Sequence, residues 1–216
     1  MKLRKKKWDL VKLDNVIVDI KDGGTPSRSK PQYFGGNICW CIVKDIKPEI
    51  YDTSEKLTEE GLKKCSSKLW PINSVIISLG ATIGQVGIAK VPVATKQGLS
   101  GIIVEKNKIS PEFLAVILNF KKEFIQSLAT GTTIKEVRPS RLKEALKLPL
   151  PPPKEQTQIA ELFQSIEIGI EQAEQQEKNL LKLKNQLLRE LFGEEMRFGN
   201  LLSAKDFEKV KFEKIA

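Results

Sequence analysis

The sequence predicts an α+β protein: a mixed, strand-rich domain followed by one long helix that forms a coiled coil. Short apolar runs separated by Gly, Pro and polar clusters extend from Trp8 to Leu148, a pattern typical of strands joined by turns. A proline-rich segment follows, and beyond it apolar residues recur at alternating steps of three and four, which is typical of a coiled coil. A chain of 216 residues is long enough to bury a core.

The first part of the chain contains five runs with the length and β-branched content of strands. These runs are Val16–Ile20, Ile38–Val43, Val75–Leu79, Gly84–Lys90 and Gly101–Glu105. They alternate with turn-forming residues, so we expect residues 1–148 to fold as one domain.

Two helices are expected within this domain. Ser110-Pro111-Glu112 has the cap, the first-turn proline and the acidic residue of a helix start. Leu114, Leu118, Ile125 and Leu128 follow at roughly helical spacing. A shorter helix is expected after Thr58.

The prolines of Leu146–Pro153 cannot continue a helix or a central strand, because each removes an amide donor and restricts the residue before it. We therefore predict a stiff hinge over 149–153 and one helix over 154–192. At about 1.5 Å per residue this helix is roughly 58 Å long, too long to hide its apolar stripe on one small domain.

The helix has a heptad pattern over about five repeats. Its apolar seam consists of Ile159, Phe163, Ile166, Ile170, Ala173, Leu180, Leu187 and Leu191. The charged residues Glu177 and Lys184 occupy two further seam positions. A symmetric antiparallel pair can place these opposite charges together, whereas a parallel homodimer stacks like charges. The sequence therefore favours an antiparallel homodimer.

The tail, 193–216, contains a short echo of the start of the chain. Residues 207–215 align with 8–16, with an aromatic, an acidic residue and a Val-Lys pair at matching places. Either a second copy of the domain begins here, or the match is the chance periodicity of a short amphipathic strand.

Charge is unevenly spread along the chain. Residues 1–150 contain 26 Lys and Arg against 15 Asp and Glu, whereas 151–216 contain 10 against 12. A basic domain beside a near-neutral segment indicates that the domain meets a polyanion. The alternative is a lysine-rich solubilising surface.

The sequence also argues against catalysis. It contains no histidine, so imidazole bases, His-activated nucleophiles and His metal ligands are excluded. It has no glycine-rich nucleotide loop with a following helix, and its Cys39/Cys41 spacing indicates buried thiols on one face of a strand. Asp45, Glu49 and Asp52 are expected to be solvated rather than to hold Mg²⁺. We predict no catalytic residue, metal or cofactor.

The basic N-terminus leads to no apolar run, and no stretch is long enough to span a bilayer. We therefore expect a cytoplasmic protein with no membrane contact.

Three polar and basic stretches are candidates for contact with DNA, because they combine cations for phosphate with short polar side chains for the grooves. Their predicted DNA-binding residues are Lys21, Thr25, Ser27, Arg28 and Lys30 in the first, Lys96 and Gln97 in the second, and Thr132, Thr133, Lys135, Arg138 and Arg141 in the third. Alternatives are a solvated turn for the first, a core Gln for the second, and a Ser140 cap of a helix starting near Arg141 for the third.

With these features located, the chain resembles the specificity subunits of type I restriction-modification enzymes from Trp8 to Phe192. The resemblance rests on the order of its motifs: Trp8-x-x-Val11-x-Leu13, Gly23-Gly24-Thr25-Pro26-Ser27, Ile38-x-Trp40, Val75-Ile76-Ile77-Ser78, Thr82-Ile83-Gly84, Thr95-x-Gln97, Gly131-Thr132, Leu148-Pro149-Leu150-Pro151-Pro152-Pro153-x-Glu155-Gln156-x-x-Ile159 and Leu188-x-x-x-Phe192.

The resemblance implies a DNA target-recognition domain and a conserved-region helix that docks methylation subunits, which would carry S-adenosylmethionine, together with a restriction subunit. Such subunits usually hold two recognition domains, and this chain has one. We therefore expect an antiparallel homodimer that reads a bipartite double-stranded DNA site. The alternatives are a coiled-coil scaffold with an incidental basic domain, a recognition fragment of a fused methyltransferase-nuclease, and a nuclease with dispersed acidic metal ligands.

Overall fold

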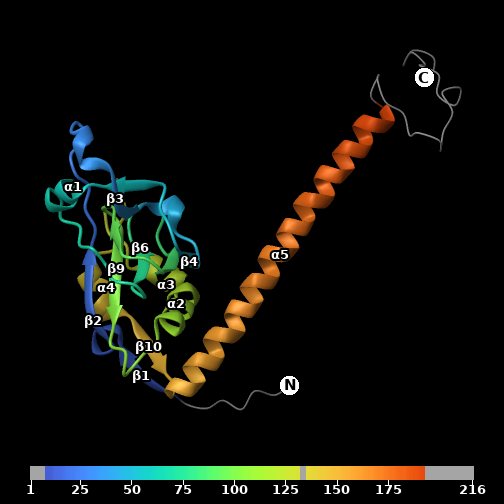
Figure 1. The fold of residues 1–216 in the computed structure, drawn as a ribbon. Coiled ribbons are helices and arrows are strands. Elements are labelled where there is room, and N and C mark those ends of the chain that lie inside the picture. The colour runs from blue at the N-terminus through green and yellow to red at the C-terminus, as the bar shows by residue number, and fades with distance from the viewer. Residues whose placement is uncertain (1–7, 132–134, 193–216) are drawn as a thin grey trace, which may run out of the picture. The chain divides into compact units, whose positions relative to one another are not determined.

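The structure, a computed structural model, describes residues 8–131 and 135–192. It confirms the predicted α+β architecture, with mixed sheets followed by one long helix (Figure 1). The chain divides into two compact units between Phe163 and Gln164. The sheets and the first turns of the long helix belong to the first unit.

The described strands form three sheets. The largest has the order β2 (Ile17–Asp22), β9 (Leu99–Val104), β6 (Val75–Ser78), β7 (Val86–Ala89) and β4 (Glu49–Ile50). A second has the order β5 (Glu55–Leu57), β3 (Phe34–Cys41) and β8 (Val93–Thr95), and a third pairs β1 (Asp9–Lys12) with β10 (Lys147–Leu150). Neighbours are antiparallel except for the parallel pairs β3–β8 and β4–β7. The five predicted strands correspond to β2, β3, β6, β7 and β9.

Strand β6 shows how the sequence builds the core. All of its residues are buried, and alternate side chains point to opposite faces. Val75 and Ile77 join a core cluster with the helices, whereas Ile76 packs with Trp70 and Cys41 between the larger two sheets. The first three residues of this strand are therefore apolar because both of its faces are covered, and the last, Ser78, is a buried polar residue.

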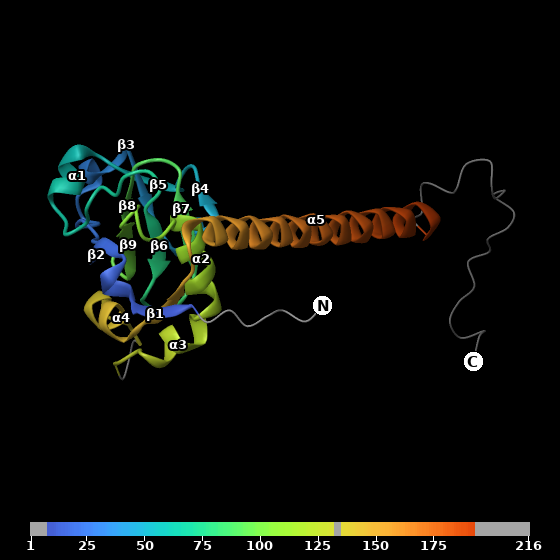
Figure 2. The ribbon, with the colours of Figure 1, turned by 90° about the horizontal axis from the view of Figure 1, so that it is seen from below.

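The helices are α1 (Glu59–Lys63), α2 (Pro111–Phe120), α3 (Lys122–Ser127), α4 (Pro139–Ala145) and α5 (Pro153–Phe192), with 3-10 turns at Leu13–Asn15, Pro31–Tyr33 and Val43–Asp45. Figure 2 shows α3 and α4 on one side of the strands and α1 on the other. Buried residues of α2, α3 and α4 share one core cluster with β6 and β9.

The predicted helix starts at Ser110 and Thr58 are confirmed. The Ser110 hydroxyl accepts from the Phe113 N–H at 3.1 Å, and the Thr58 hydroxyl accepts from the Gly61 N–H at 3.1 Å. The first of these helices differs in one respect from the prediction, because a turn at Lys121 divides it into α2 and α3.

Two expectations near the proline-rich segment need correction. Helix α4 begins at Pro139 with Arg138 as its cap residue, so Ser140 lies inside the helix and does not cap it. The segment 149–153 is not a hinge throughout, because Pro149 and Leu150 belong to β10. Among the described strands β10 pairs with β1 alone, so it is an edge strand. A proline is tolerated there because no second neighbouring strand needs the missing amide donor.

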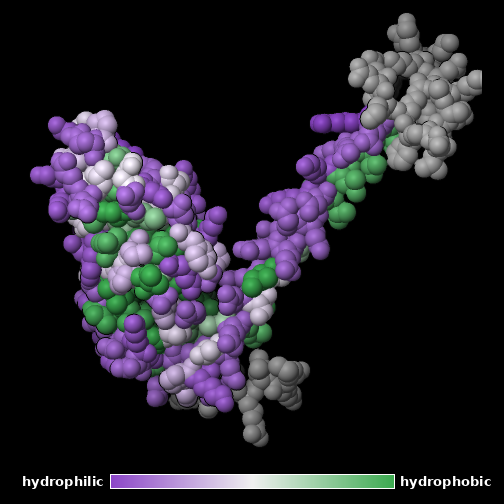
Figure 3. Space-filling model, viewed as in Figure 1, coloured by the Kyte–Doolittle hydropathy of each residue, from purple (hydrophilic) through white to green (hydrophobic). Residues whose placement is uncertain are grey.

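Helix α5 is one continuous helix of 40 residues and begins at Pro153, one residue before the predicted start. From Phe163 onward its apolar residues remain largely accessible: Ile166 is 48% exposed, Ile170 53% and Leu180 66%. Figure 3 shows apolar side chains gathered along one side of this helix. Residues 193–216, including the echo at 207–215, lie outside the described residues.

Candidate nucleic-acid interface

The first predicted stretch, 21–30, leaves β2 and packs at once against β8 and β9. The Gly23 N–H donates to the Leu99 carbonyl and the Gly24 N–H to the Thr95 carbonyl, both at 2.9 Å. A Cβ on Gly23 would lie 2.1 Å from the Thr95 oxygen. The paired glycines therefore permit close contact with neighbouring strands.

Asp22 connects the first stretch, 21–30, to the second stretch through hydrogen bonds. Its carboxylate accepts from the Gly98 N–H, with oxygens at 3.2 and 3.4 Å, and from the Ser100 hydroxyl at 3.5 Å. Burial raises the pKa of Asp22 above its ordinary value, although these hydrogen bonds oppose the effect. The first two stretches thus lie together at one end of β2 and β9.

The third stretch reaches the same place through the end of β6. The Val137 N–H donates to the Leu79 carbonyl at 2.8 Å, and the N–H groups of Leu79 and Gly80 both donate to the Gly98 carbonyl at 2.8 and 2.9 Å. The charge of Glu136 also contributes to the raised pKa of Asp22. All three predicted stretches therefore converge around Gly98.

Most of the predicted contact side chains are accessible. Thr25 and Lys96 are half-buried, and the exposed ones are Lys21, Ser27, Arg28, Lys30, Gln97, Lys135, Arg138 and Arg141. Thr132 and Thr133 lie outside the described residues. Because Gln97 is exposed, the alternative of a core glutamine is wrong.

Six of these cations form no ion pair with any described residue. They are Lys21, Lys30, Lys96, Lys135, Arg138 and Arg141, and the ion pairs of the described chain use other lysines and Arg28. Accessible cations that lie in adjoining segments and form no ion pair with a described residue suit phosphate binding.

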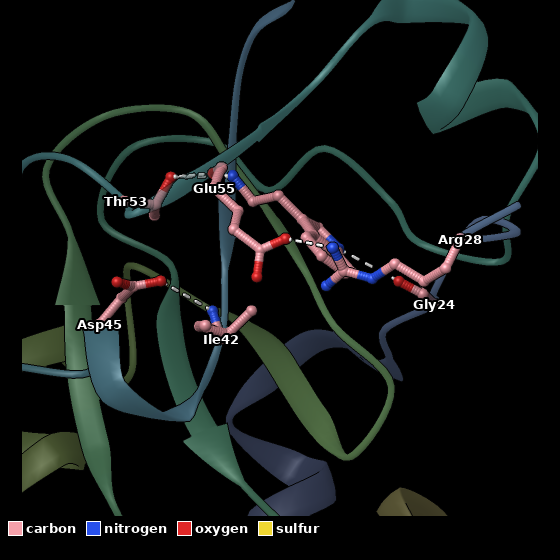
Figure 4. Close-up of polar contacts among 7 residues, drawn as sticks. Gly24, Arg28, Ile42, Asp45, Thr53 and Glu55 are labelled. Carbon is pink, nitrogen blue, oxygen red and sulfur yellow. Dashed lines mark hydrogen bonds and ion pairs between the residues drawn. The ribbon is translucent and has the colours of Figure 1, made fainter. Parts of the chain in front are cut away.

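Arg28 differs from the other cations because its guanidinium is held in place. Its Nη1 donates to Glu55 Oε2 at 2.6 Å, as Figure 4 shows. The guanidinium also lies over the rings of Phe34 and Trp40, at 4.7 and 5.2 Å from their centroids. The hydrogen bond from Arg28, followed by its charge and that of Lys96, lowers the pKa of Glu55 below its ordinary value.

Sequence reasoning missed one segment at this surface. The turn 80–84 follows β6, and its Ala81 and Thr82 are exposed beside the Gly98 loop. The Ser78 hydroxyl closes the turn by donating to the Thr82 carbonyl. The sequence marks Thr82-Ile83-Gly84 only as part of the family resemblance, and no DNA contact was predicted there.

The acidic residues weighed as metal ligands, Asp45, Glu49 and Asp52, form hydrogen bonds and ion pairs within the domain. They line a hollow of about 570 Å³ together with Lys44, Lys47 and other residues of 49–54. The Asp45 carboxylate accepts from the Ile42 N–H at 3.1 Å (Figure 4). It also accepts from the Ser54 N–H at 3.0 Å. Glu49 pairs with Lys90 at 3.1 Å and Asp52 with Lys56 at 3.1 Å. Within residues 8–131 and 135–192, no three potential ligands are grouped as a metal ion needs.

The cysteines are free thiols, as predicted. Cys41 is buried and Cys39 half-buried in the cluster around Trp70, and burial raises the pKa of Cys41 to about 12. No helix among the described residues is long and apolar enough to cross a membrane.

Comparison with known proteins identifies the family. A family model described as the type I restriction modification DNA specificity domain matches residues 5–183. The chain belongs to this family. A relative in the specificity family, the type I restriction enzyme MjaIX specificity subunit of Methanocaldococcus jannaschii, is 32% identical over 193 residues, which are 87% of this chain and 44% of the relative. The EcoR124I/EcoR124II specificity subunit of Escherichia coli is 28% identical over 148 residues, 65% of this chain and 36% of the relative.

Solved structures show the same fold. The S subunit of a type I restriction-modification system from M. genitalium aligns with a TM-score of 0.60 and 21% identity, over 89% of this chain and 48% of that one. The HsdS subunit from Thermoanaerobacter tengcongensis aligns with a TM-score of 0.58 and 19% identity, over 81% and 40%. This specificity-family chain spans less than half the length of these relatives and neighbours.

Proposed function

We propose that this chain is the non-catalytic, sequence-specific DNA-recognition subunit of a type I restriction-modification complex. Residues 1–148 are its target-recognition domain and bind double-stranded DNA. The observation that carries the proposal is the convergence around Gly98 of three separate stretches that together present six cations with no ion pair in the described chain. Membership of the specificity family supports the same function.

The long helix 154–192 is the assembly element of the proposal. Its accessible apolar seam forms an antiparallel coiled coil with a second copy of the chain. The dimer then holds two recognition domains and reads a bipartite, two-fold symmetric site. It directs methylation subunits, which carry S-adenosylmethionine, and a restriction subunit to that site in the cytoplasm. The echo of 8–16 at 207–215 supports a further part of the proposal, that the tail 193–216 resembles the start of a second recognition domain.

Replacing Lys135, Arg138 and Arg141 together by Ala tests the DNA interface. Each lost phosphate contact lowers the slope of log affinity against log salt by about 0.9, and a lost base contact costs about 1–3 kcal/mol. We therefore expect the triple variant to bind duplex DNA at least 100-fold more weakly, measured by fluorescence anisotropy over a series of salt concentrations.

The matched control replaces Lys106, Lys147 and Lys154 by Ala, because these exposed lysines lie at the other end of β9, in β10 and in the first turn of α5. This variant loses the same charge, so it should keep most of the affinity. Equal losses in the two variants would mean that only net charge matters. Absence of salt-sensitive duplex binding in the unmodified chain would favour the scaffold alternative.

Reversing the charge at Glu177 tests the antiparallel orientation. In the proposed coil Glu177 lies against the partner's Lys184, so Glu177→Lys creates two like-charge contacts per dimer and should weaken the dimer about 10-fold. Adding Lys184→Glu in the same chain restores opposite charges and should restore the dimer. In a parallel coil the double variant still stacks like charges, and no rescue would be seen in sedimentation equilibrium.

A further inference from the structure

The loop that carries Arg28 is fixed by the same ring on which Arg28 stacks. Trp40 is fully buried, and its indole N–H donates to the Gly24 carbonyl at 3.1 Å. The ring of Phe34 meets that of Trp40 edge to face, with centroids 5.9 Å apart. Arg28 therefore projects from an anchored loop onto a preformed aromatic surface, and little of its rotamer freedom remains to be lost on binding.

The Arg28 guanidinium is fixed in position but remains accessible to solvent. The side chain of Arg28 remains 52% exposed and that of Glu55 30% exposed. Glu55 uses one N–H of Nη1, and no other hydrogen bond of the guanidinium to the described chain is present. The rest of the guanidinium fork can therefore still donate two parallel hydrogen bonds to a ligand.

The carboxylate of Glu55 determines which chemical group of DNA Arg28 is suited to bind. An Arg beside a Glu has almost no net charge, so the pair attracts a phosphate weakly, and the carboxylate repels it. Guanine is different, because its O6 and N7 are uncharged acceptors that an arginine fork contacts bidentately in the major groove. The charges of Lys96 and Lys44 act on Glu55 from nearby. Neither lysine forms an ion pair with a described residue, so both are suited to the flanking phosphates.

We infer that Arg28 reads a guanine in each half of the target site and that Glu55 is the positioning residue that orients it. This inference rests on the proposed DNA-recognition function. It adds the base that is recognised, the residue that contacts it and the residue that positions that contact. A pair that only links the loop to β5 would not require the rest of the guanidinium to stay exposed, yet the Arg28 side chain is 52% exposed.

The experiment compares base preference in the full-length chain and four variants. The unmodified chain first selects bound sequences from a randomised duplex pool, and the enriched site is then titrated with every single base-pair change. The variants are Arg28→Ala, Arg28→Lys, Glu55→Gln and, as the control, Lys30→Ala. The control removes an exposed cation of the same loop that forms no ion pair with a described residue.

Arg28→Ala should lose about 10- to 100-fold of discrimination at one G·C position of each half-site, while its affinity for unrelated DNA and its salt slope change less than two-fold. Glu55→Gln should relax preference at the same position by a smaller factor. Lys30→Ala should weaken binding to all duplexes alike and lower the salt slope. Preference at a single position is a readout that a purely structural role of Glu55 would leave unchanged.

Other outcomes overturn the inference in distinguishable ways. If the unmodified chain selects a site and both Arg28 variants keep its full profile, the inference fails and DNA recognition stands. A uniform loss with a reduced salt slope in Arg28→Ala identifies a phosphate contact, which also overturns it. If the unmodified chain selects no sequence, the proposed function fails and the inference with it. Should thermal melting show that Arg28→Ala is unfolded, Arg28→Lys decides, because it keeps the stem and the charge but not the fork.

Discussion

Replacing Gln156 by Leu is expected to lower the free energy of unfolding of the recognition domain by about 2–4 kcal/mol. Gln156 is only 2% exposed. Its amide nitrogen donates to the carbonyls of Lys108 and Pro151, both at 2.9 Å, and its oxygen accepts from the Ser110 N–H at 3.0 Å. Leu keeps the volume but leaves these three backbone groups without partners, at about 1–3 kcal/mol for each one that stays buried.

This glutamine joins the first turn of α5 to the residues that start α2. The Gln158→Leu variant is the control, since Gln158 is exposed two residues further along the same helix. Both variants are compared by guanidinium unfolding followed by tryptophan fluorescence, and only Gln156→Leu should shift the midpoint strongly. Equal midpoints in the two variants would show that solvent replaces the three lost hydrogen bonds.

Some strands of the fold could be predicted from the sequence and others could not. Strands such as β6 were recognised because an apolar run bounded by turn residues predicts them locally. Strand β10 was missed because its sequence contains Pro149, and its pairing with β1 depends on a segment more than 130 residues away. No local sequence pattern predicts a strand pair between segments so far apart. The proline-rich segment was therefore interpreted as a hinge.

The candidate interface likewise combines features that the sequence reveals locally with features that depend on long-range strand pairing. Its cations and hydroxyls were found because residue type alone marks them. Their convergence was not predictable, because it depends on the order β2-β9-β6, in which neighbours are distant in sequence. The same holds for Arg28, whose partner Glu55 lies 27 residues away, and for Gly23, whose lack of a side chain serves contact with Thr95.

The last prediction concerns α5, where two isoleucines allow a matched comparison. Ile170 lies on the heptad seam, whereas Ile168 precedes it by two residues, about 200° around a helix of 3.6 residues per turn. Both are similarly accessible, at 53% and 48%. Because a homodimer buries two copies of a seam residue, each contributing about 1.5–3 kcal/mol, Ile170→Glu should raise the dimer dissociation constant at least 100-fold.

Ile168→Glu introduces the same charge on the far side of the helix and should leave the dissociation constant within a few-fold. Sedimentation equilibrium measures both, and circular dichroism checks that helix content is retained. If both variants dissociate alike, the seam has been placed on the wrong face. If the unmodified chain is a stable monomer at micromolar concentration, the two recognition domains of the proposed subunit cannot come from two copies of this chain, and a symmetric bipartite site loses its physical basis.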